Sequence, residues 1–476
     1  MKIAHLPLDS RPCNLLFPCQ LAAWCGHACT VPPEMDFFTT PASFESSRDF
    51  LLREIHDADA LVVSADHLCY GSLLESRNDG ISEEEALQRL ELLCELRRRK
   101  PDLPIHVYSV LMRSSVSALC AGDLELHRAM TAYSFYTDRA AQTGNGEDAA
   151  RAREAYERLP QEVLIRYRQA RSRNHAVNMR CAQMAETGIV DSLLLLQEDS
   201  ELYGFHKAEQ RTLVKQYGHL LKSCIRMHNG TDEGGALAVM KAIGQKHPLP
   251  PVSVRFLGWK DGDFIARYED RPFGENVWDS LAYADLRTEE DAQDVLAVCC
   301  PPDGLQTDWP NPAHADGLEK EAEEIVRMAR AGRKVYVLDV TRANGGAPAL
   351  MQAVFRRAPD LPLAGYSAWN TASNSLGTAI AQMMSDRLAG KVNQTFLWER
   401  LLDDLAYQGV VRGDLNDELE AEGEDLLHLK NPQDAEKRLR EKMDAYLSAE
   451  PMFAHVSAFT VCLPWGRTFE AEILVK

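Results

Sequence analysis

The sequence predicts an α/β protein built on mostly parallel sheets, and two observations support this fold class. First, short apolar segments recur along the chain and read as buried strands, because strands covered by helices on both faces are continuously apolar. They lie at residues 3–8, 60–65, 105–111, 192–197, 252–257, 295–299, 335–338 and 363–368. Second, segments with helical periodicity separate them, which is the pattern of parallel strands joined by crossover helices.

The intervening helices carry recognisable start and stop signals. Ser82 followed by Glu85 forms a capping box ahead of a helix at residues 86–98. Residues 317–331 have one charged and one apolar face, as an amphipathic helix does. Residues 373–389 follow a polar corner and precede Gly390, the residue type that most often ends a helix.

The organisation of the chain favours two doubly wound lobes, with one irregular β/α barrel as the alternative. Residues 1–250 form the first lobe, with a helical insert at about 118–186 that interrupts any eightfold repeat. Residues 251–390 form the second lobe, after a proline cluster. Residues 391–476 are read as charged helices that return to two short strands at 456–464 and 469–475.

Composition excludes several classes of partner. The 476-residue chain carries a net charge of −19, which argues against a nucleic-acid surface. No apolar run approaches the ~20 residues of a membrane span, so no membrane partner is expected. The twelve cysteines show no metal-binding spacing, and no signal peptide precedes the first strand. We therefore expect a reduced, cytoplasmic protein with a small-molecule substrate, whose oligomeric state stays open.

Polar residues follow most of the predicted strands at the point where each strand ends. They are Asp9 and Arg11, then Asp66, His67 and Tyr70, then Arg113, then Glu198 and Asp199, then Asp339, Arg342 and Asn344, and finally Trp369 and Asn370. Ligands of parallel α/β sheets bind outside the carboxyl ends of the strands. Asp and Asn also make turns and caps there, but Arg113 and Trp369 are not capping residue types. The pattern indicates one shared site.

Two further segments join this set. Asn174 and Asn178 lie four residues apart on one helical face, beside Arg173, and are read either as sugar-binding amides or as a solvated surface. Asp232 and Glu233 precede a helix at 236–243, where the helix dipole explains one carboxylate but not obviously both.

Several of these blocks together resemble one family. The segments PLDSRPCN, SADHLCYGSLLESR, LMR, SRNHAVN, LQED, TDE, NGG, AWNTASNSLG and WGRTFE are similar to the signature blocks of DUF4127, a bacterial family of unknown function. They run from residue 7 to residue 470. Glu198 stands where a second Asp is expected, and Ser72 where Gly is expected. The resemblance implies that the blocks act as a unit, and it implies no particular reaction.

The abundance of carboxylates favours a carbohydrate-active hydrolase that uses a carboxyl pair as acid and base or nucleophile. The expected catalytic residues are Asp199, Asp232, Glu233, Asp66 and Asp9. Asp199 and Asp232 are the first choice for the pair, and no cofactor is needed. The expected substrate-binding residues are Arg11, Tyr70, Arg77, Arg113, Arg173, Asn174, Asn178, Asp339, Asn344, Trp369, Asn370 and Asn374.

Two alternatives stay open. A divalent-metal-dependent hydrolase, isomerase or lyase would hold Mg²⁺ or Mn²⁺ with Asp66, Asp199 or Asp339. The arginines at these strand ends either bind an anionic sugar or pair with the neighbouring acids. A non-catalytic protein that binds a small ligand is the third reading.

Overall fold

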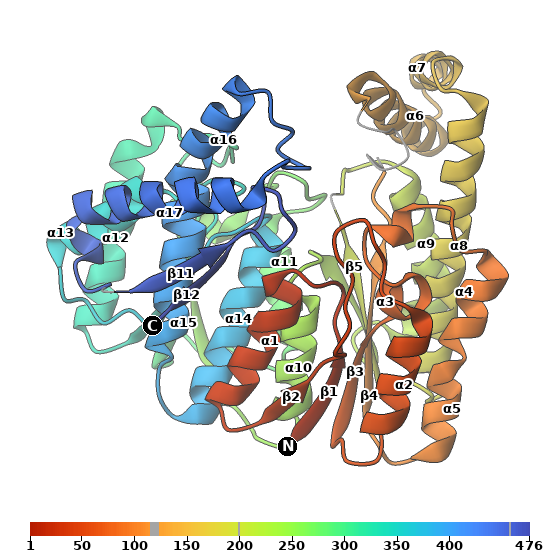
Figure 1. Ribbon diagram of the computed structural model, residues 1–476, viewed down its shortest axis with the longest axis horizontal. Coiled ribbons are helices and arrows are strands. Elements are labelled where there is room, and N and C mark those ends of the chain that lie inside the picture. Colours follow the sequence, from red (N-terminus) through yellow and green to blue (C-terminus); the bar gives the residue numbers. More distant parts are fainter. Residues whose placement is uncertain (115–122, 199, 457) are drawn as a thin grey trace. The chain divides into compact units, whose positions relative to one another are not determined.

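The computed structural model describes residues 1–114, 123–198, 200–456 and 458–476 (Figure 1). The described chain divides into two compact units. Unit 1 comprises Met1–Ser10, His27–Ile243 and Tyr268–Asp270. Unit 2 comprises Arg11–Gly26, Gly244–Arg267 and Arg271–Lys476. The chain therefore enters each unit more than once.

Unit 1 is built on a six-stranded parallel sheet with the order β2-β1-β3-β4-β5-β6. Its strands are β1 (Lys2–Leu6), β2 (Ala28–Thr30), β3 (Ala60–Ser64), β4 (Ile105–Leu111), β5 (Ser192–Gln197) and β6 (Ile225–Asn229). The sheet grows in one direction from β1 to β2 and in the other from β3 onward. The topological switch point, where ligands of doubly wound sheets bind, consequently lies between β1 and β3.

Helices cover this sheet because its strands are apolar on both faces. One face packs in a continuous core against α2 (Phe44–Glu54), α3 (Ala65–Tyr70), α4 (Glu83–Leu90), α5 (Leu92–Arg99), α8 (Gln161–Glu186) and α9 (Phe205–Tyr217). Figure 1 shows α2, α4, α5 and α8 on that side of the strands. Helix α10 (Gly234–Gly244) contacts the opposite face, where its first residues meet side chains of β1, β4 and β5.

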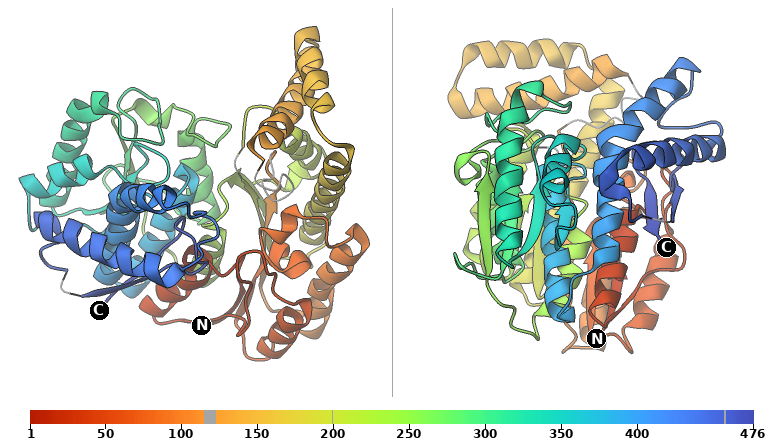
Figure 2. Two further views of the ribbon diagram at one scale, coloured as in Figure 1. Left: turned by 45° about the horizontal axis from the view of Figure 1, so that its top comes forward. Right: turned by 90° about the vertical axis from the view of Figure 1, so that its left-hand side faces the viewer.

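The described part of the expected insert, from residue 123 onward, is mainly helical. It contains α6 (Leu124–Thr143) and α7 (Gly146–Glu157), followed by α8. Gly144 ends α6 with φ 71°, and the Asn145 side chain caps α7 by accepting from the Glu147 N–H. Helices α6 and α7 lie beyond the carboxyl-terminal edge of the six-stranded sheet (Figure 2).

Unit 2 contains a four-stranded parallel sheet with the order β10-β9-β8-β7. Its strands are β7 (Val252–Leu257), β8 (Asp294–Cys299), β9 (Lys334–Asp339) and β10 (Gly365–Ser367). The helices before β10 are α1 (Pro12–Trp24), α11 (Phe273–Tyr283), α12 (Ala315–Arg330) and α13 (Pro348–Arg357). Helix α14 (Ala372–Ala389) packs on β9, on β10 and on α1. Gly390 ends α14 as expected, with φ 70°.

The carboxyl-terminal part of the chain packs into the core of unit 2. It comprises α15 (Gln394–Arg400), the π-helical segment η5 (Leu401–Val411), α16 (Arg412–Ala421), α17 (Pro432–Ala449) and an antiparallel hairpin of β11 (Phe459–Cys462) and β12 (Glu472–Val475). At the start of η5, Arg400 is paired with Asp403 and Asp404, all three of them buried. The Asp404 side chain in turn accepts from the Ala368 N–H, just beyond β10.

These findings confirm the predicted fold class and show that the barrel alternative is wrong, because both parallel sheets are open. The sequence predicted a lobe boundary at residue 250, and in the structure the chain passes from unit 1 to unit 2 after Ile243. Two parts of the chain lie where the sequence did not place them. Helix α1 belongs to unit 2, and residues 391–476 share the core of that unit instead of forming a separate segment.

Two simple properties complete the description. Within the described ranges, no helix combines the length and apolarity that a bilayer span requires. Within those ranges no two cysteines form a disulfide, and Cys13, Cys69, Cys181, Cys299 and Cys300 are buried. The apolar environment predicted for scattered cysteines is therefore found for these five.

Candidate functional site

The switch point of unit 1 brings two carboxylates to the ends of neighbouring strands. Asp9 follows β1, and Asp66 follows β3 in the first turn of α3. Their relative exposures are 0% and 1%. Tyr108 of β4 lies near both, since burial and then the charges of Asp9 and Asp66 raise the pKa of its hydroxyl well above the ordinary value. The two acids therefore share one environment.

Asp66 is held in a conformation suited to proton transfer. Its Oδ2 accepts a hydrogen bond of 2.9 Å from the Val110 N–H of β4. Burial raises the pKa of Asp66 to about 7, although the Val110 N–H and the guanidinium groups of Arg77 and Arg173 oppose that rise. A carboxyl group whose pKa lies near the working pH can both give and take a proton.

A buried ion-pair group occupies the ends of β4 and β5. Arg77 donates to Glu198 Oε1, and Arg113 Nη1 lies 3.9 Å from the same oxygen. The Glu198 side chain is 8% exposed, whereas that of Arg113 is 18% exposed. Two of the expected substrate-binding arginines thus stabilise a neighbouring acid, which was one of the two interpretations left open by the sequence.

The turn before α10 holds a second buried carboxyl group. Glu233 Oε2 accepts a 2.8 Å hydrogen bond from the Thr231 N–H, and Oε1 lies 3.9 Å from His228 Nδ1. Burial raises the pKa of Glu233 well above its ordinary value, and the charges of Asp232 and Glu269 raise it further. Its burial therefore favours the neutral form of Glu233, which stands next to Asp232 in the chain.

Glycines explain how this turn comes so close to the sheet. Gly230 has φ 122°, and a Cβ built on it would lie 1.9 Å from Glu233 Oε1. A Cβ on Gly235 would lie 3.0 Å from His5 Nε2 and 3.2 Å from Tyr108 Oη. Tyr108 is also the neighbour of Asp9 and Asp66, so the GTDEGG segment places Asp232 and Glu233 at the same edge.

The asparagines on the polar face of α8 form hydrogen bonds within the protein. Asn174 Nδ2 donates to the carbonyl groups of Ser76 and Ala170, at 2.6 and 2.7 Å. Asn178 Nδ2 donates to the Val110 carbonyl at 3.3 Å, and Asn178 Oδ1 accepts from the Ser109 hydroxyl at 2.6 Å.

Arg173 has a similar role. It donates to the Ser76 and Ile81 carbonyl groups, and its guanidinium lies 4.3 Å from the centre of the buried Tyr70 ring. Our expectation that Arg173, Asn174, Asn178 and Tyr70 bind substrate finds no support in these contacts. The hydrogen bonds of Arg173, Asn174 and Asn178 hold the segment after β3 and strand β4.

The carboxyl ends of β9 and β10 form the polar edge of unit 2. Asp339 Oδ1 accepts from the N–H and hydroxyl groups of Thr341, and Oδ2 accepts from the Ala347 N–H and the Tyr366 hydroxyl. These four bonds fix the loop that contains Asn344, whose φ is 59°. The Asn344 N–H donates to the carbonyl of Asn370, which has φ 68°.

A cluster of arginine and aromatic side chains lies in the same unit. The Arg11 guanidinium is 5.4 Å from the Trp465 ring centre, and its Nε is 3.9 Å from Glu470 Oε1. Arg467 makes two hydrogen bonds to Glu470. Trp465 and Glu470 were missed as site residues, although the WGRTFE block that contains them was noticed. Trp369 and Asn374 are also buried in unit 2.

A comparison with known protein families identifies the family of this chain. The family model for DUF4127, described as a protein of unknown function, matches residues 3–474. The chain belongs to the DUF4127 family. The resemblance inferred from the sequence blocks is thereby confirmed. A search of curated proteins found no match to this DUF4127 chain.

Only part of the predicted site is brought together in one unit of this DUF4127 protein. Unit 1 gathers Asp9, Asp66, Glu198, Asp232 and Glu233, together with Arg77 and Arg113. Arg11, Asp339, Asn344, Trp369, Asn370 and Asn374 belong to unit 2. Asp199, the first choice for the catalytic pair, lies outside the described residues.

The metal alternative depends on which side chains could act as ligands, and of its three candidates the structure describes Asp66 and Asp339. Among the side chains that the structure describes, no group of three or more His, Cys, Asp and Glu residues is arranged to hold a metal ion. Asp339 does not fit a cation, because protein donors already occupy both of its oxygens. Asp66 lies in unit 1, whereas Asp339 lies in unit 2. His67 lies beside Asp66, but it contacts Ser47 Oγ at 3.1 Å, and burial lowers the pKa of its imidazole to about 4.

Proposed function

We propose that this DUF4127 protein is a carbohydrate-active hydrolase whose carboxyl groups act at the β1/β3 switch point of unit 1. The observation that carries the proposal is the burial of Asp66, Asp232 and Glu233 just beyond strands of the same sheet. Burial raises the pKa of Asp66 to about 7, and it raises the pKa of Glu233, in the turn that also contains Asp232, well above its ordinary value. Carboxyl groups in environments that separate their pKa values are the usual basis of acid and base roles in one site.

In the proposed reaction, Asp66 and Asp232 are the acid and the base. Asp66 gives its proton to the glycosidic oxygen as the bond from that oxygen to the anomeric carbon breaks. A water molecule attacks the anomeric carbon, and its proton passes to the carboxylate of Asp232. The products are two sugars with free hydroxyl groups. Glu233 is a positioning residue that fixes the turn around Asp232 through its bond to the Thr231 N–H.

The substrate is a small sugar, and Arg113 points to an anionic one. Arg113 keeps part of its side chain exposed while lying beside Glu198. A guanidinium in that position attracts a carboxylate or phosphate group of the substrate. The proposal requires no cofactor. It includes a cytoplasmic location, where disulfides are rare, and the described cysteines form none.

The experiment is a panel of 4-methylumbelliferyl glycosides and glycuronides, tested with the parent protein and three variants. Asp66→Asn and Asp232→Asn should each lower kcat by ~10²–10⁴-fold, the usual contribution of a general acid or base. The matched control is Asp386→Asn in α14 of unit 2, since burial also raises the pKa of Asp386 to about 7. Turnover per folded molecule should be unchanged in that control.

Three results would contradict the proposal. If either site variant keeps near-normal turnover, its acid is not part of the reaction. Absence of turnover together with tight binding of an intact sugar would favour a binding protein. Activity that is lost with EDTA and restored by Mn²⁺ would favour the metal-dependent alternative.

A further inference from the structure

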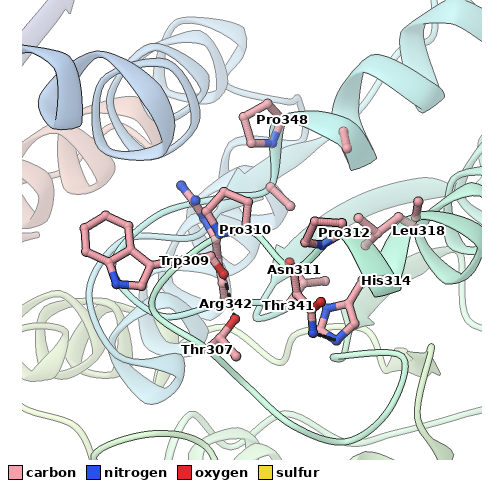
Figure 3. Close-up of a pocket in the computed structure, with 13 residues that line it drawn as sticks. Thr307, Trp309, Pro310, Asn311, Pro312, His314, Leu318, Thr341, Arg342 and Pro348 are labelled. Atoms are coloured by element: carbon pink, nitrogen blue, oxygen red, sulfur yellow. Dashed lines mark hydrogen bonds between the residues drawn. The ribbon is translucent and has the colours of Figure 1, made fainter.

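A cavity of about 330 Å³ lies in unit 2 at the carboxyl ends of β8 and β9 (Figure 3). Its walls come from the loop after β8, the first turn of α12, and the segment that connects β9 to α13. This volume falls within the range of ~300–1,000 Å³ that is usual for small-molecule pockets. The edge of the sheet is also the usual place for a ligand in a parallel α/β unit.

The walls of this cavity are almost entirely apolar. Pro310, Pro312, Pro348 and Leu318 contribute to the lining, and the indole of Trp309 is 76% exposed. Figure 3 shows Trp309 and Leu318 towards opposite ends.

The polar side chains of the lining are engaged with the protein. The Thr341 hydroxyl donates to Asp339, the Thr307 hydroxyl donates to the Trp309 carbonyl, and Asn311 contacts His314. A sugar bound here would leave most of its hydroxyl groups without partners, which is unfavourable. The occupant must therefore be mainly apolar.

Arg342 is the exception in this lining. It is only 7% exposed, and in Figure 3 its side chain extends alongside Pro310. Nε donates to the Gly345 carbonyl at 3.1 Å and Nη2 to the Gly409 carbonyl at 2.7 Å. The third nitrogen, Nη1, donates to no group of the described residues. The nearby acid Asp339 gives this cation no direct ion pair, since its oxygens are bound by other donors.

We propose that this cavity binds a small apolar carboxylate, with the carboxylate at Arg342 Nη1 and the hydrocarbon body against the proline and tryptophan walls. A buried cation with an unused donor is best compensated by an anion. The positive ends of two helices add to this preference, because Ala315 begins α12 and Pro348 begins α13. This site is independent of the proposed hydrolase site in unit 1.

The test compares two probes of the same shape by isothermal titration calorimetry. The probes are 2-naphthoate and the neutral 2-naphthalenemethanol. The parent protein should bind 2-naphthoate at least about tenfold more tightly, as expected for a charge-assisted hydrogen bond. Arg342→Gln should remove that preference while the neutral probe still binds.

A second variant keeps the test decisive if Arg342→Gln fails to fold. Ala349 lines the cavity and is exposed, so Ala349→Trp should fill the cavity from its rim without disturbing the core. Both probes should then lose binding. The proposal is overturned if the parent binds neither probe, if it binds both equally, or if Ala349→Trp leaves the affinity for 2-naphthoate unchanged.

Discussion

Replacing Asp66 by Asn should stabilise the protein at alkaline pH, and the size of the effect follows from its environment. Burial raises the pKa of Asp66 from 3.8 to about 7, so ionising this carboxyl costs the folded state free energy. A difference of that size corresponds to about 4 kcal/mol when the group is fully ionised. The amide side chain of the Asp66→Asn variant keeps the acceptor that the Val110 N–H needs but carries no charge.

The sign of the pH dependence is fixed by the direction of the pKa change. Between pH 4 and pH 7 the folded protein holds a proton on Asp66 that the unfolded chain has released. The contribution of Asp66 to stability is therefore complete below pH 3.8 and is lost as the pH rises through about 7. The stability advantage of Asp66→Asn over the parent should grow across this window and stay constant above it.

The assay is urea denaturation of both proteins from pH 5 to pH 8, with the difference in the free energy of unfolding plotted against pH. Asp79→Asn is the control, because its hydrogen bond and ion pair to Arg166 lower the pKa of Asp79. That substitution should destabilise the protein by an amount that stays constant from pH 5 to pH 8, because this whole range lies above the ordinary pKa of 3.8. A difference between Asp66→Asn and the parent that does not change with pH would refute the reasoning.

Three further predictions concern close packing and burial. Gly230→Ala should displace the Glu233 carboxyl, because the new Cβ would lie 1.9 Å from Oε1, and both melting temperature and glycosidase activity should fall. Gly346→Ala should strongly lower the melting temperature, since its Cβ would lie 1.8 Å from Tyr366 Oη; adding Tyr366→Phe should restore part of the loss, and a purely additive double variant would contradict this contact. Glu321→Met should raise the free energy of unfolding by about 1–3 kcal/mol, because Glu321 is buried and its burial raises the pKa of the carboxyl to about 9, so a less stable variant in urea denaturation would count against this prediction.

Strand periodicity predicted most of the fold because buried parallel strands are uninterrupted apolar runs. Segments 105–111, 192–197 and 252–257 coincide with β4, β5 and β7. Two strands, β2 and β6, were not predicted, because neither is an uninterrupted apolar run. β2 has only three residues and is partly exposed, and β6 contains Arg226 and His228 among its five residues. Neither looks like a covered central strand.

The site was less predictable, because a residue type does not reveal its partners. Asp66 was chosen as an acid at a strand end and Glu233 as an acid ahead of a helix, and both are buried. Asp339 looked the same in sequence, but it accepts from three donors of its own loop and from the Tyr366 hydroxyl of β10. The spacing of Asn174 and Asn178 predicted a shared face correctly, yet that face meets backbone carbonyl groups of neighbouring segments.

The assignment of α1 to unit 2 has a consequence for protein synthesis. This helix leaves the ribosome early, but Leu21 accepts its hydrogen bond from Ser385, 364 residues later. At 5–20 residues per second, roughly 20–70 s pass before that partner exists. Throughout this interval the apolar side chains of Phe17 and Leu21 have no completed core to enter. The nascent chain therefore presents a segment that chaperones would be expected to shield, and a fragment beginning after residue 26 would lack it altogether.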